Sequence, residues 1–282
     1  MKLCRYGKPG YEKPGMIDGE GKLRDLSKVV DNLGPNEISP RGLKMLTRLK
    51  AESLPLVNGN PRLGVPYVGI GKLVAIGLNY SDHAKEAGLP IPSEPIVFMK
   101  ATTCINGPYD DVIQPRNSTK LDWEIELGVV IGTTARYVDE ASALNYVAGY
   151  CIVNDVSERA FQMATTQWDK GKGFDTSGPI GPWLVTTDEI QDPQTLDMKL
   201  EVNGKVMQSG NTRTMVFDVA KIISHVSQYM TLLPGDVIAT GTPPGVGLGM
   251  KPPVFLKPGD VMTLTIEGLG QQRQKVVPYS AQ

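Results

Sequence analysis

An alternation of acidic and apolar residues over Asp122–Val130 constrains the fold of this chain more than any other segment. Side chains alternate between the two faces of a strand, so a strand here would place Asp122, Glu124 and Glu126 on one face and the apolar residues between them on the other. Carboxylates two residues apart on one face repel each other unless a cation compensates them. Taken alone, the pattern is more typical of a solvated strand face than of a binding site.

The next apolar segment favours a binding site over a solvated strand face. Residues Ala148–Val153 are nearly all apolar, which predicts a buried strand, and this strand ends in Asn154-Asp155. A carboxylate at the end of a buried strand needs a partner. Carboxylate oxygens from two neighbouring strand ends, with no histidine or cysteine nearby, suit a hard cation such as Mg²⁺, Mn²⁺ or Ca²⁺. The sequence therefore predicts a metal site on Glu124, Glu126 and Asp155.

A histidine and a glutamate lie three residues apart, shortly after the apolar run Lys72–Gly77. If they lie on helical turns, His83 and Glu86 are neighbours on one face. A carboxylate beside an imidazole raises its basicity and fixes its tautomer, as a water-activating base requires. The Gly- and Pro-rich residues 88–92 would suit the hinge of a lid. The alternative is an exposed His–Glu pair on a surface helix.

Two later segments carry candidate substrate contacts. Arg159 and Gln162 are three residues apart in a helix predicted to begin near Ser157, so both side chains would share a face and point toward a metal-bound ligand. Lys172 belongs to a predicted flexible loop, Lys170–Phe174. For that loop, a solvated surface position and a role in neutralising substrate charge agree equally well with the sequence.

The charge, the cysteines and one glycine-rich segment argue against several classes of function. The chain has 29 basic and 30 acidic residues, whereas nucleic-acid and membrane-surface binders need a basic field. Its three cysteines lie far apart without a CxxC motif, so we expect no disulfide framework or zinc site, and reduced thiols fit a cytoplasmic protein. No apolar stretch approaches the ~20 residues of a membrane span, and we expect no signal peptide. The segment Gly245–Gly249 has the wrong spacing for a dinucleotide loop and leads into Pro252-Pro253 instead of a helix.

The organisation of the chain predicts an α+β fold that is mostly β. With 31 glycines and 22 prolines, it is rich in turns that separate short strand candidates, and Asn203-Gly204 is a strong hairpin signal. The clearest helix is predicted over Met215–Met230, and a shorter one over Arg41–Glu52. We expect a small β-rich unit over residues 1–70 and a larger catalytic unit over residues 71–282.

In their order along the chain, these motifs resemble the fumarylacetoacetate hydrolase family. The resemblance covers roughly residues 72–280. The matching segments are Gly77-Leu78-Asn79-Tyr80 with His83 and Glu86, Phe98-Met99-Lys100, Glu124-x-Glu126, Asn154-Asp155-Val156-Ser157 with Arg159 and Gln162, Lys172-Gly173-Phe174, and the tail Leu233–Pro243. Residues 1–70 match only the general form of the small N-terminal domain in bacterial members.

The resemblance implies a mixed β-sandwich or β-roll catalytic domain that forms a homodimer or a higher homo-oligomer. It implies Mg²⁺ or Mn²⁺, with Ca²⁺ as a further candidate, on the three carboxylates, and it implies catalytic roles for His83, Glu86 and Lys172. The substrate contacts that it implies are Arg159, Gln162, Lys100, Thr240 and Tyr80. An extra upstream aspartate ligand of the longer eukaryotic members has no counterpart here, which places the chain with the smaller bacterial branch that acts on acylpyruvates.

The chemistry that the resemblance implies is hydrolysis of a 2,4-dioxo acid. A water activated by His83 would attack C4, and the C3–C4 bond would break to leave pyruvate. The opening Met1–Gly7 and Gly15–Gly19 look like those of enzymes for 2,4-diketo-3-deoxy-aldonates from L-fucose or L-rhamnose. Alternatives that use the same site are oxaloacetate decarboxylation, 2-hydroxydienoate isomerisation or hydration, and ureidoglycolate cleavage. A protein that only binds an oxo acid is the alternative outside enzymes.

Overall fold

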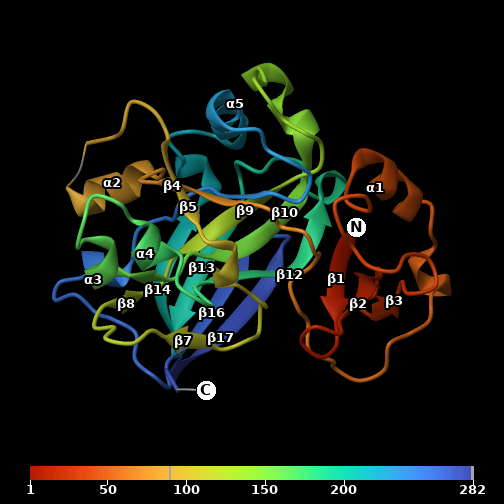
Figure 1. The fold of residues 1–282 in the computed structure, drawn as a ribbon, viewed down its shortest axis with the longest axis horizontal. Helices are drawn as coiled ribbons and strands as arrows, with labels where there is room; N and C mark the ends of the chain where they lie inside the picture. Colours follow the sequence, from red (N-terminus) through yellow and green to blue (C-terminus); the bar gives the residue numbers. More distant parts are fainter. Residues whose placement is uncertain (89, 281–282) are drawn as a thin grey trace.

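Two main sheets form the frame of the protein (Figure 1) in a computed structural model that describes residues 1–88 and 90–280. The larger sheet has ten strands, which in spatial order are β3 (Leu23–Asp25), β2 (Lys13–Ile17), β1 (Lys2–Tyr6), β12 (Gly178–Thr186), β10 (Val147–Asn154), β9 (Ile125–Ile131), β15 (Val237–Ala239), β4 (Leu73–Gly77) and β5 (Ile96–Lys100), with β6 (Ile105–Asn106) beside β12. The second sheet has the order β14 (Lys205–Asn211), β13 (Asp197–Val202), β16 (Val261–Ile266), β17 (Gly270–Pro278) and β7 (Val112–Gln114). The expected mixed, mostly β architecture is confirmed.

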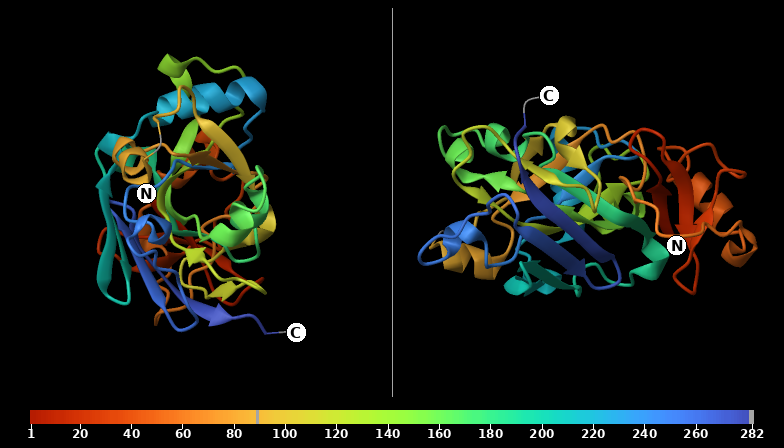
Figure 2. Two further views of the ribbon diagram at one scale, coloured as in Figure 1. Left: turned by 90° about the vertical axis from the view of Figure 1, so that its left-hand side faces the viewer. Right: turned by 90° about the horizontal axis from the view of Figure 1, so that it is seen from below.

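Apolar side chains from both sheets fill one core between them. Leu127 of β9 and Ile152 of β10 belong to the same buried cluster as Leu200 of β13 and Leu264 of β16. Two sheets whose inner faces pack against each other around a common core form a β-sandwich. In Figure 2 the blue strands β16 and β17 lie along one side of the larger sheet. The metal-site candidates therefore lie on or directly beside two strands, β9 and β10, whose residues are all buried.

The first three strands continue the larger sheet. β1 pairs antiparallel with β12, with Lys2 opposite Val185, and its other edge pairs with β2. A second buried cluster joins Leu46 and Tyr67 of the N-terminal segment to Leu73 of β4. In Figures 1 and 2 this segment, coloured red and orange, lies at the end of the molecule opposite α2 (Ser81–Ala87) and α3 (Arg159–Gln162). A domain boundary near residue 70 stays a prediction.

The helices are short, and the longest of them, over Val219–Tyr229, starts later than the sequence predicted. The elements are α1 (Pro40–Leu46), α4 (Asp169–Lys172) and α5 (Val219–Tyr229), besides α2 and α3, with 3₁₀ turns at Ala51–Ser53, Thr102–Cys104, Glu140–Tyr146, Thr187–Glu189, Thr212–Thr214 and Gly247–Gly249. α5 begins after Asp218, because that carboxylate accepts a hydrogen bond from Lys221 N at 2.7 Å and caps the helix. No helix among the described residues is both long and apolar enough to span a bilayer.

The helix predicted to begin near Ser157 has its cap one residue later, at Glu158. Residues Ser157–Glu158 form the strand β11, which pairs with β8 (Leu121–Asp122), and the helix α3 begins one residue after them. Glu158 is its cap, since the carboxylate accepts from Ala160 N at 3.0 Å. The strand considered over Asp122–Val130 is interrupted, because β8 ends at Asp122 and β9 begins at Ile125.

Candidate active site

Three buried carboxylates meet at the ends of β9 and β10. Glu126 lies opposite Val153 in the antiparallel pair, and Asp155 N donates to Glu124 O at 2.9 Å, so the register places Asp155 opposite Glu124. Opposed residues in such a pair point to the same face, as do residues two apart on one strand. The three residues therefore bring ligand oxygens within 4.8 Å of one another, and each is at most 6 % exposed.

The electrostatics of this cluster fit a divalent cation. Burial, together with the neighbouring Asp155 and Glu124, raises the pKa of Glu126 well above its usual range. Burial would also raise the pKa of Glu124, but Lys172 and Arg159 lower it to about 2. The donor set is three carboxylates without nitrogen or sulfur, which is the set that hard cations prefer. The residues present therefore fit Mg²⁺ or Mn²⁺.

Two lysines hold Asp155 from opposite sides. Lys172 Nζ lies 2.6 Å from Asp155 Oδ2 and 2.7 Å from Glu124 Oε2, while Lys100 Nζ lies 2.6 Å from Asp155 Oδ1. Lys172 is buried at the end of α4, so the predicted flexible loop is a short helix there, and of the two alternatives the solvated surface position is wrong. Its ammonium also lies 5.4 Å from the centre of the Phe98 ring. Burial would lower the pKa of Lys172, but Asp155 and Glu124 raise it, so the side chain stays charged.

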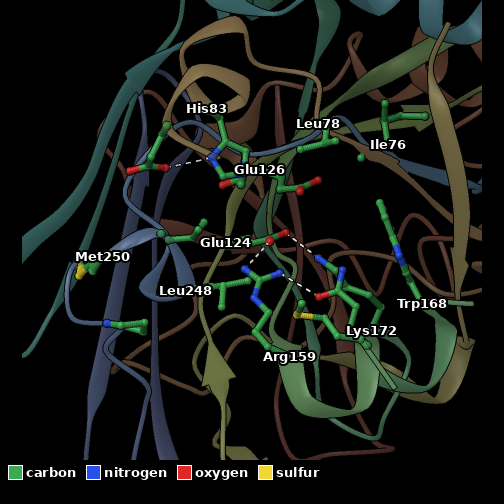
Figure 3. Close-up of a pocket in the computed structure, with 18 of the residues that line it drawn as sticks. Ile76, Leu78, His83, Glu124, Glu126, Arg159, Trp168, Lys172, Leu248 and Met250 are labelled. Atoms are coloured by element: carbon green, nitrogen blue, oxygen red, sulfur yellow. Dashed lines mark hydrogen bonds and ion pairs between the residues drawn. The ribbon is translucent and has the colours of Figure 1, made fainter. Parts of the chain in front are cut away.

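Arg159 joins the carboxylate cluster to α3. Its Nη2 lies 2.7 Å from Glu124 Oε1, its Nε donates to Asp122 Oδ2 at 2.8 Å, and its Nη1 donates to Gln162 Oε1 at 3.1 Å. The prediction that Arg159 and Gln162 share a face is therefore confirmed. Figure 3 shows the Arg159 guanidinium and Lys172 on one side of the cavity, both directed at Glu124.

The His–Glu pair lies on α2, across the cavity from Arg159. Nδ1 of His83 is 3.1 Å from Oε2 of Glu86, one helical turn away, as predicted. Glu86 also accepts hydrogen bonds from Gly245 N at 3.1 and 3.2 Å. The helix ends at Gly88, which has a positive φ of 67°, and the predicted hinge includes Leu89, which lies outside the described residues. In Figure 3 the His83 ring projects over the cavity above Glu126.

A single cavity of about 830 Å³ connects these groups. Its polar wall contains the His–Glu pair, Glu124, Glu126, Arg159, Gln162 and Lys172. Asp155 is covered by the two lysines at the base of this wall. The apolar wall contains Ile76, Leu78, Phe98, Met163, Trp168, Val246, Leu248, Met250 and Pro253. Such a cavity can hold a small anionic substrate between cationic and apolar surfaces.

Three predicted substrate contacts lie behind the cavity wall. The Tyr80 hydroxyl donates to Met198 Sδ at 3.1 Å, and the Thr240 hydroxyl donates to Leu127 O at 2.9 Å. Lys100 is 1 % exposed and bonds to Asp155, to two main-chain oxygens and to Ser177. None of the three lines the cavity, so these predictions are not supported: each polar atom is already bonded within the protein.

The apolar wall of the cavity was not predicted from the sequence. Trp168 packs edge-on against Phe98 with ring centroids 5.3 Å apart, and Leu248 and Met250 come from a loop after β15. The sequence signal for that loop is its glycine pattern, which lacks the spacing of a dinucleotide loop. Because apolar residues in loops have no periodicity, the sequence does not separate a cavity wall from a core contact.

The position of Lys100 predicts a structural role. Replacing it by Met is expected to lower the free energy of unfolding by about 3 kcal/mol, the low end for removal of one partner of a buried ion pair, since Lys172 still compensates Asp155. Chemical denaturation would measure this loss. The exposed Lys170→Met is the matched control and should change stability by less than about 0.5 kcal/mol. A K100M protein of unchanged stability but weakened substrate binding would return Lys100 to the substrate contacts.

A family model and a curated relative identify the same kind of protein for this chain. The family model described as fumarylacetoacetate hydrolase C-terminal matches residues 72–277. The chain is 61 % identical over 278 residues to a 2,4-didehydro-3-deoxy-L-rhamnonate hydrolase from Sphingomonas sp. strain SKA58, covering 98 % of this chain and 96 % of that protein.

Two solved structures are similar over their whole length. A fumarylacetoacetate hydrolase from psychrophilic Exiguobacterium antarcticum superposes with a TM-score of 0.89 at 38 % identity, covering 99 % of this chain and 100 % of that one. A maleylpyruvate hydrolase from Sphingobium sp. SYK-6, solved with manganese(II) and pyruvate, has a TM-score of 0.84 at 30 % identity, with 99 % and 100 % covered. These matches span the cavity and both sheets.

Proposed function

Because the chain belongs to the fumarylacetoacetate hydrolase family, we propose that it is a metal-dependent hydrolase that cleaves the carbon–carbon bond of a 2,4-dioxo acid to give pyruvate and a carboxylic acid. One observation carries the proposal. A carboxylate cluster with the donor set of a hard cation reaches one cavity through Glu124 and Glu126, and a His–Glu pair and two cationic side chains border the same cavity.

The proposed metal ligands are Glu124, Glu126 and Asp155. A divalent cation held there would supply Lewis-acid polarisation of the substrate oxygens. The manganese ion in the maleylpyruvate hydrolase supports a divalent metal. Mg²⁺ and Mn²⁺ are the proposed ions and Ca²⁺ is the third candidate, because all three prefer oxygen ligands.

His83 is the proposed general base. Its Nδ1 faces Glu86, which leaves Nε2 to accept a proton from the attacking water. The water oxygen then bonds to C4 of the substrate, and the C3–C4 bond breaks with its electron pair going to C3. C3 then takes up the proton that His83 received from the water, which gives pyruvate, and C4 leaves as the new carboxylic acid. Glu86 stabilises the imidazolium while the proton stays on His83.

Lys172, Arg159 and Gln162 are the proposed substrate-binding residues, since all three line the cavity. Lys172 and Arg159 carry positive charge close to Glu124, where a substrate carboxylate or a developing oxyanion would otherwise be repelled by the acidic cluster. Gln162 is fixed by its bond with Arg159 and offers its amide nitrogen to the substrate.

The proposed substrate is a 2,4-diketo-3-deoxy-aldonate, as the name of the 61 % identical relative suggests. The test is pyruvate release from protein stripped with chelator and reloaded with Mg²⁺ or Mn²⁺. The panel contains 2,4-didehydro-3-deoxy-L-rhamnonate, acetylpyruvate, fumarylpyruvate and oxaloacetate. We expect metal-dependent release, fastest with the rhamnonate derivative. Activity on oxaloacetate alone would make the protein a decarboxylase, and silence on all four would refute the proposed function.

The proposal also covers the cellular compartment and the oligomeric state of the protein. The thiols of Cys4, Cys104 and Cys151 are free and buried, which supports a reducing compartment such as the cytoplasm. The homodimer that the family resemblance implies stays a prediction, and it is checked by light scattering of the purified protein.

A further inference from the structure

The loop Gly245–Gly249 lies between Glu86 of the His–Glu pair and Asp122, and these two acidic side chains hold it from two sides. On one side Gly245 N donates to both carboxylate oxygens of Glu86. On the other side Gly247 N and Leu248 N donate to Asp122 at 2.7 and 3.0 Å. This loop carries the cavity residue Leu248, so its position sets the shape of the substrate space.

Two glycines are required for these contacts. A Cβ on Gly247 would lie 2.7 Å from Asp122 Oδ1 and 2.0 Å from Val254 O. Gly245 has a positive φ of 102°, and a Cβ there would lie 2.0 Å from Met207 O. Only glycine permits such close approach and this backbone region. The glycine pattern is therefore explained by the contacts of the loop.

Asp122 joins this loop to Arg159. Its side chain is fully buried, and besides the two loop amides it accepts from Trp123 N at 2.9 Å and from Arg159 Nε at 2.8 Å. Trp123 Nε1 in turn donates to Gly245 O at 3.0 Å. The same carboxylate thus fixes the loop and the guanidinium that reaches Glu124 Oε1.

We propose that Asp122 is a positioning residue that couples the α2 helix to Arg159 through the Gly245–Gly249 loop. Hydrogen bonds link His83 to Glu86 and Glu86 to Gly245. The main chain leads from Gly245 to Gly247, and hydrogen bonds then link Gly247 to Asp122 and Asp122 to Arg159. When α2 is docked, the loop and Arg159 take the positions that bind substrate. When α2 moves away, Gly245 loses its acceptor and the loop is held from one side only.

The test is Asp122→Asn with Asp236→Asn as the matched control. An asparagine still accepts at Oδ1, but its amide nitrogen cannot accept from Leu248 N or from Arg159 Nε. Asp236 is equally buried and also accepts two main-chain amides and pairs with a lysine, Lys72, but it does not line the cavity. A purely structural loss should therefore be the same in both variants.

The first readout is amide hydrogen exchange, which needs neither substrate nor activity. In D122N we expect faster exchange both in peptides covering residues 245–250 and in peptides covering residues 81–88, with neither changed in D236N. Faster exchange confined to 245–250, or equal changes in both variants, would overturn the proposal. Should D122N fail to fold, exchange in the wild-type protein decides: the two segments must open as one unit, and independent opening refutes the coupling.

The second readout is kinetic and rests on the proposed function. We expect D122N to lower kcat/KM about 10²-fold, mainly through KM, because a displaced Arg159 weakens substrate binding. In a cycle with Arg159→Lys, the two changes should be non-additive, since a lysine no longer bridges Asp122 and Glu124. Additive effects would overturn the link to Arg159. A wild-type protein inactive on every substrate would refute the proposed function and leave the exchange result valid.

Discussion

Replacing His83 by Ala is expected to lower kcat about 10²–10⁴-fold, the range for loss of a general base, while the affinity for Mn²⁺ stays unchanged. His83 lines the cavity, but its ring nitrogen is bonded to Glu86 and not to the carboxylate cluster. Steady-state kinetics and titration calorimetry with Mn²⁺ would measure the two quantities separately. The change removes no charge from the metal ligands, so the metal-loaded protein should form normally.

His225→Ala is the control for this experiment. His225 lies on α5, where its ring packs edge-on against Tyr229 with centroids 5.0 Å apart, and it does not line the cavity. Its kinetic constants should match those of the wild-type protein. If the His83 variant lost metal affinity and turnover to the same degree, His83 would be assigned to the metal site and no longer to the base.

Replacing Glu126 by Gln is expected to weaken Mn²⁺ binding by more than the 10–100-fold that loss of an outer-shell partner costs. Activity at a fixed Mn²⁺ concentration should fall accordingly and recover only in part at high metal concentration. Glutamine keeps the shape and still accepts from Gly241 N, the 2.9 Å bond that Glu126 makes, so the loss reports on charge and donor strength. Calorimetry of chelator-treated protein would give the affinity.

The stability of this variant shows whether Glu126 is a metal ligand or a residue that the fold requires. Glu126 is buried beside Glu124 and Asp155, so its neutral replacement removes like-charge repulsion, and metal-free E126Q should unfold at no lower denaturant concentration than the metal-free wild type. Glu12→Gln is the control, because Glu12 pairs with Arg62 outside the cavity and its loss should leave metal binding unchanged. Wild-type Mn²⁺ affinity in E126Q would refute the ligand assignment.

Much of the metal site was predictable from the sequence because its geometry is local. Glu124 and Glu126 are two residues apart, and an extended backbone places both side chains on one face, with Glu126 on β9 and Glu124 directly before it. Asp155 follows the eight buried residues of β10. Strands that follow each other in the sequence usually lie side by side in a sheet, as β9 and β10 do here. The pairing of His83 with Glu86 follows in the same way from helical spacing.

The predictions that failed depend on contacts between distant segments. Lys100 and Thr240 were assigned to the substrate, but Lys100 is 55 residues from its partner Asp155 and Thr240 is 113 residues from its partner Leu127. Sequence spacing does not encode which of two lysines faces a cavity. The break after Asp122 also coincides with long-range contacts, since its carboxylate accepts hydrogen bonds from Arg159 and from a loop 125 residues away.

The sequence by itself determined the mostly β fold, the three carboxylates and the His–Glu pair, because alternation, helical spacing and turn residues act between near neighbours. Only the tertiary structure decided that Lys172 is buried against Asp155, that Lys100 supports the cluster from behind, and that a glycine loop forms a wall of the cavity. The physical reason is that a buried charge pairs with whichever polar or charged group packing places beside it. Packing joins segments that are far apart in the sequence, and such contacts produce no periodic pattern of residues.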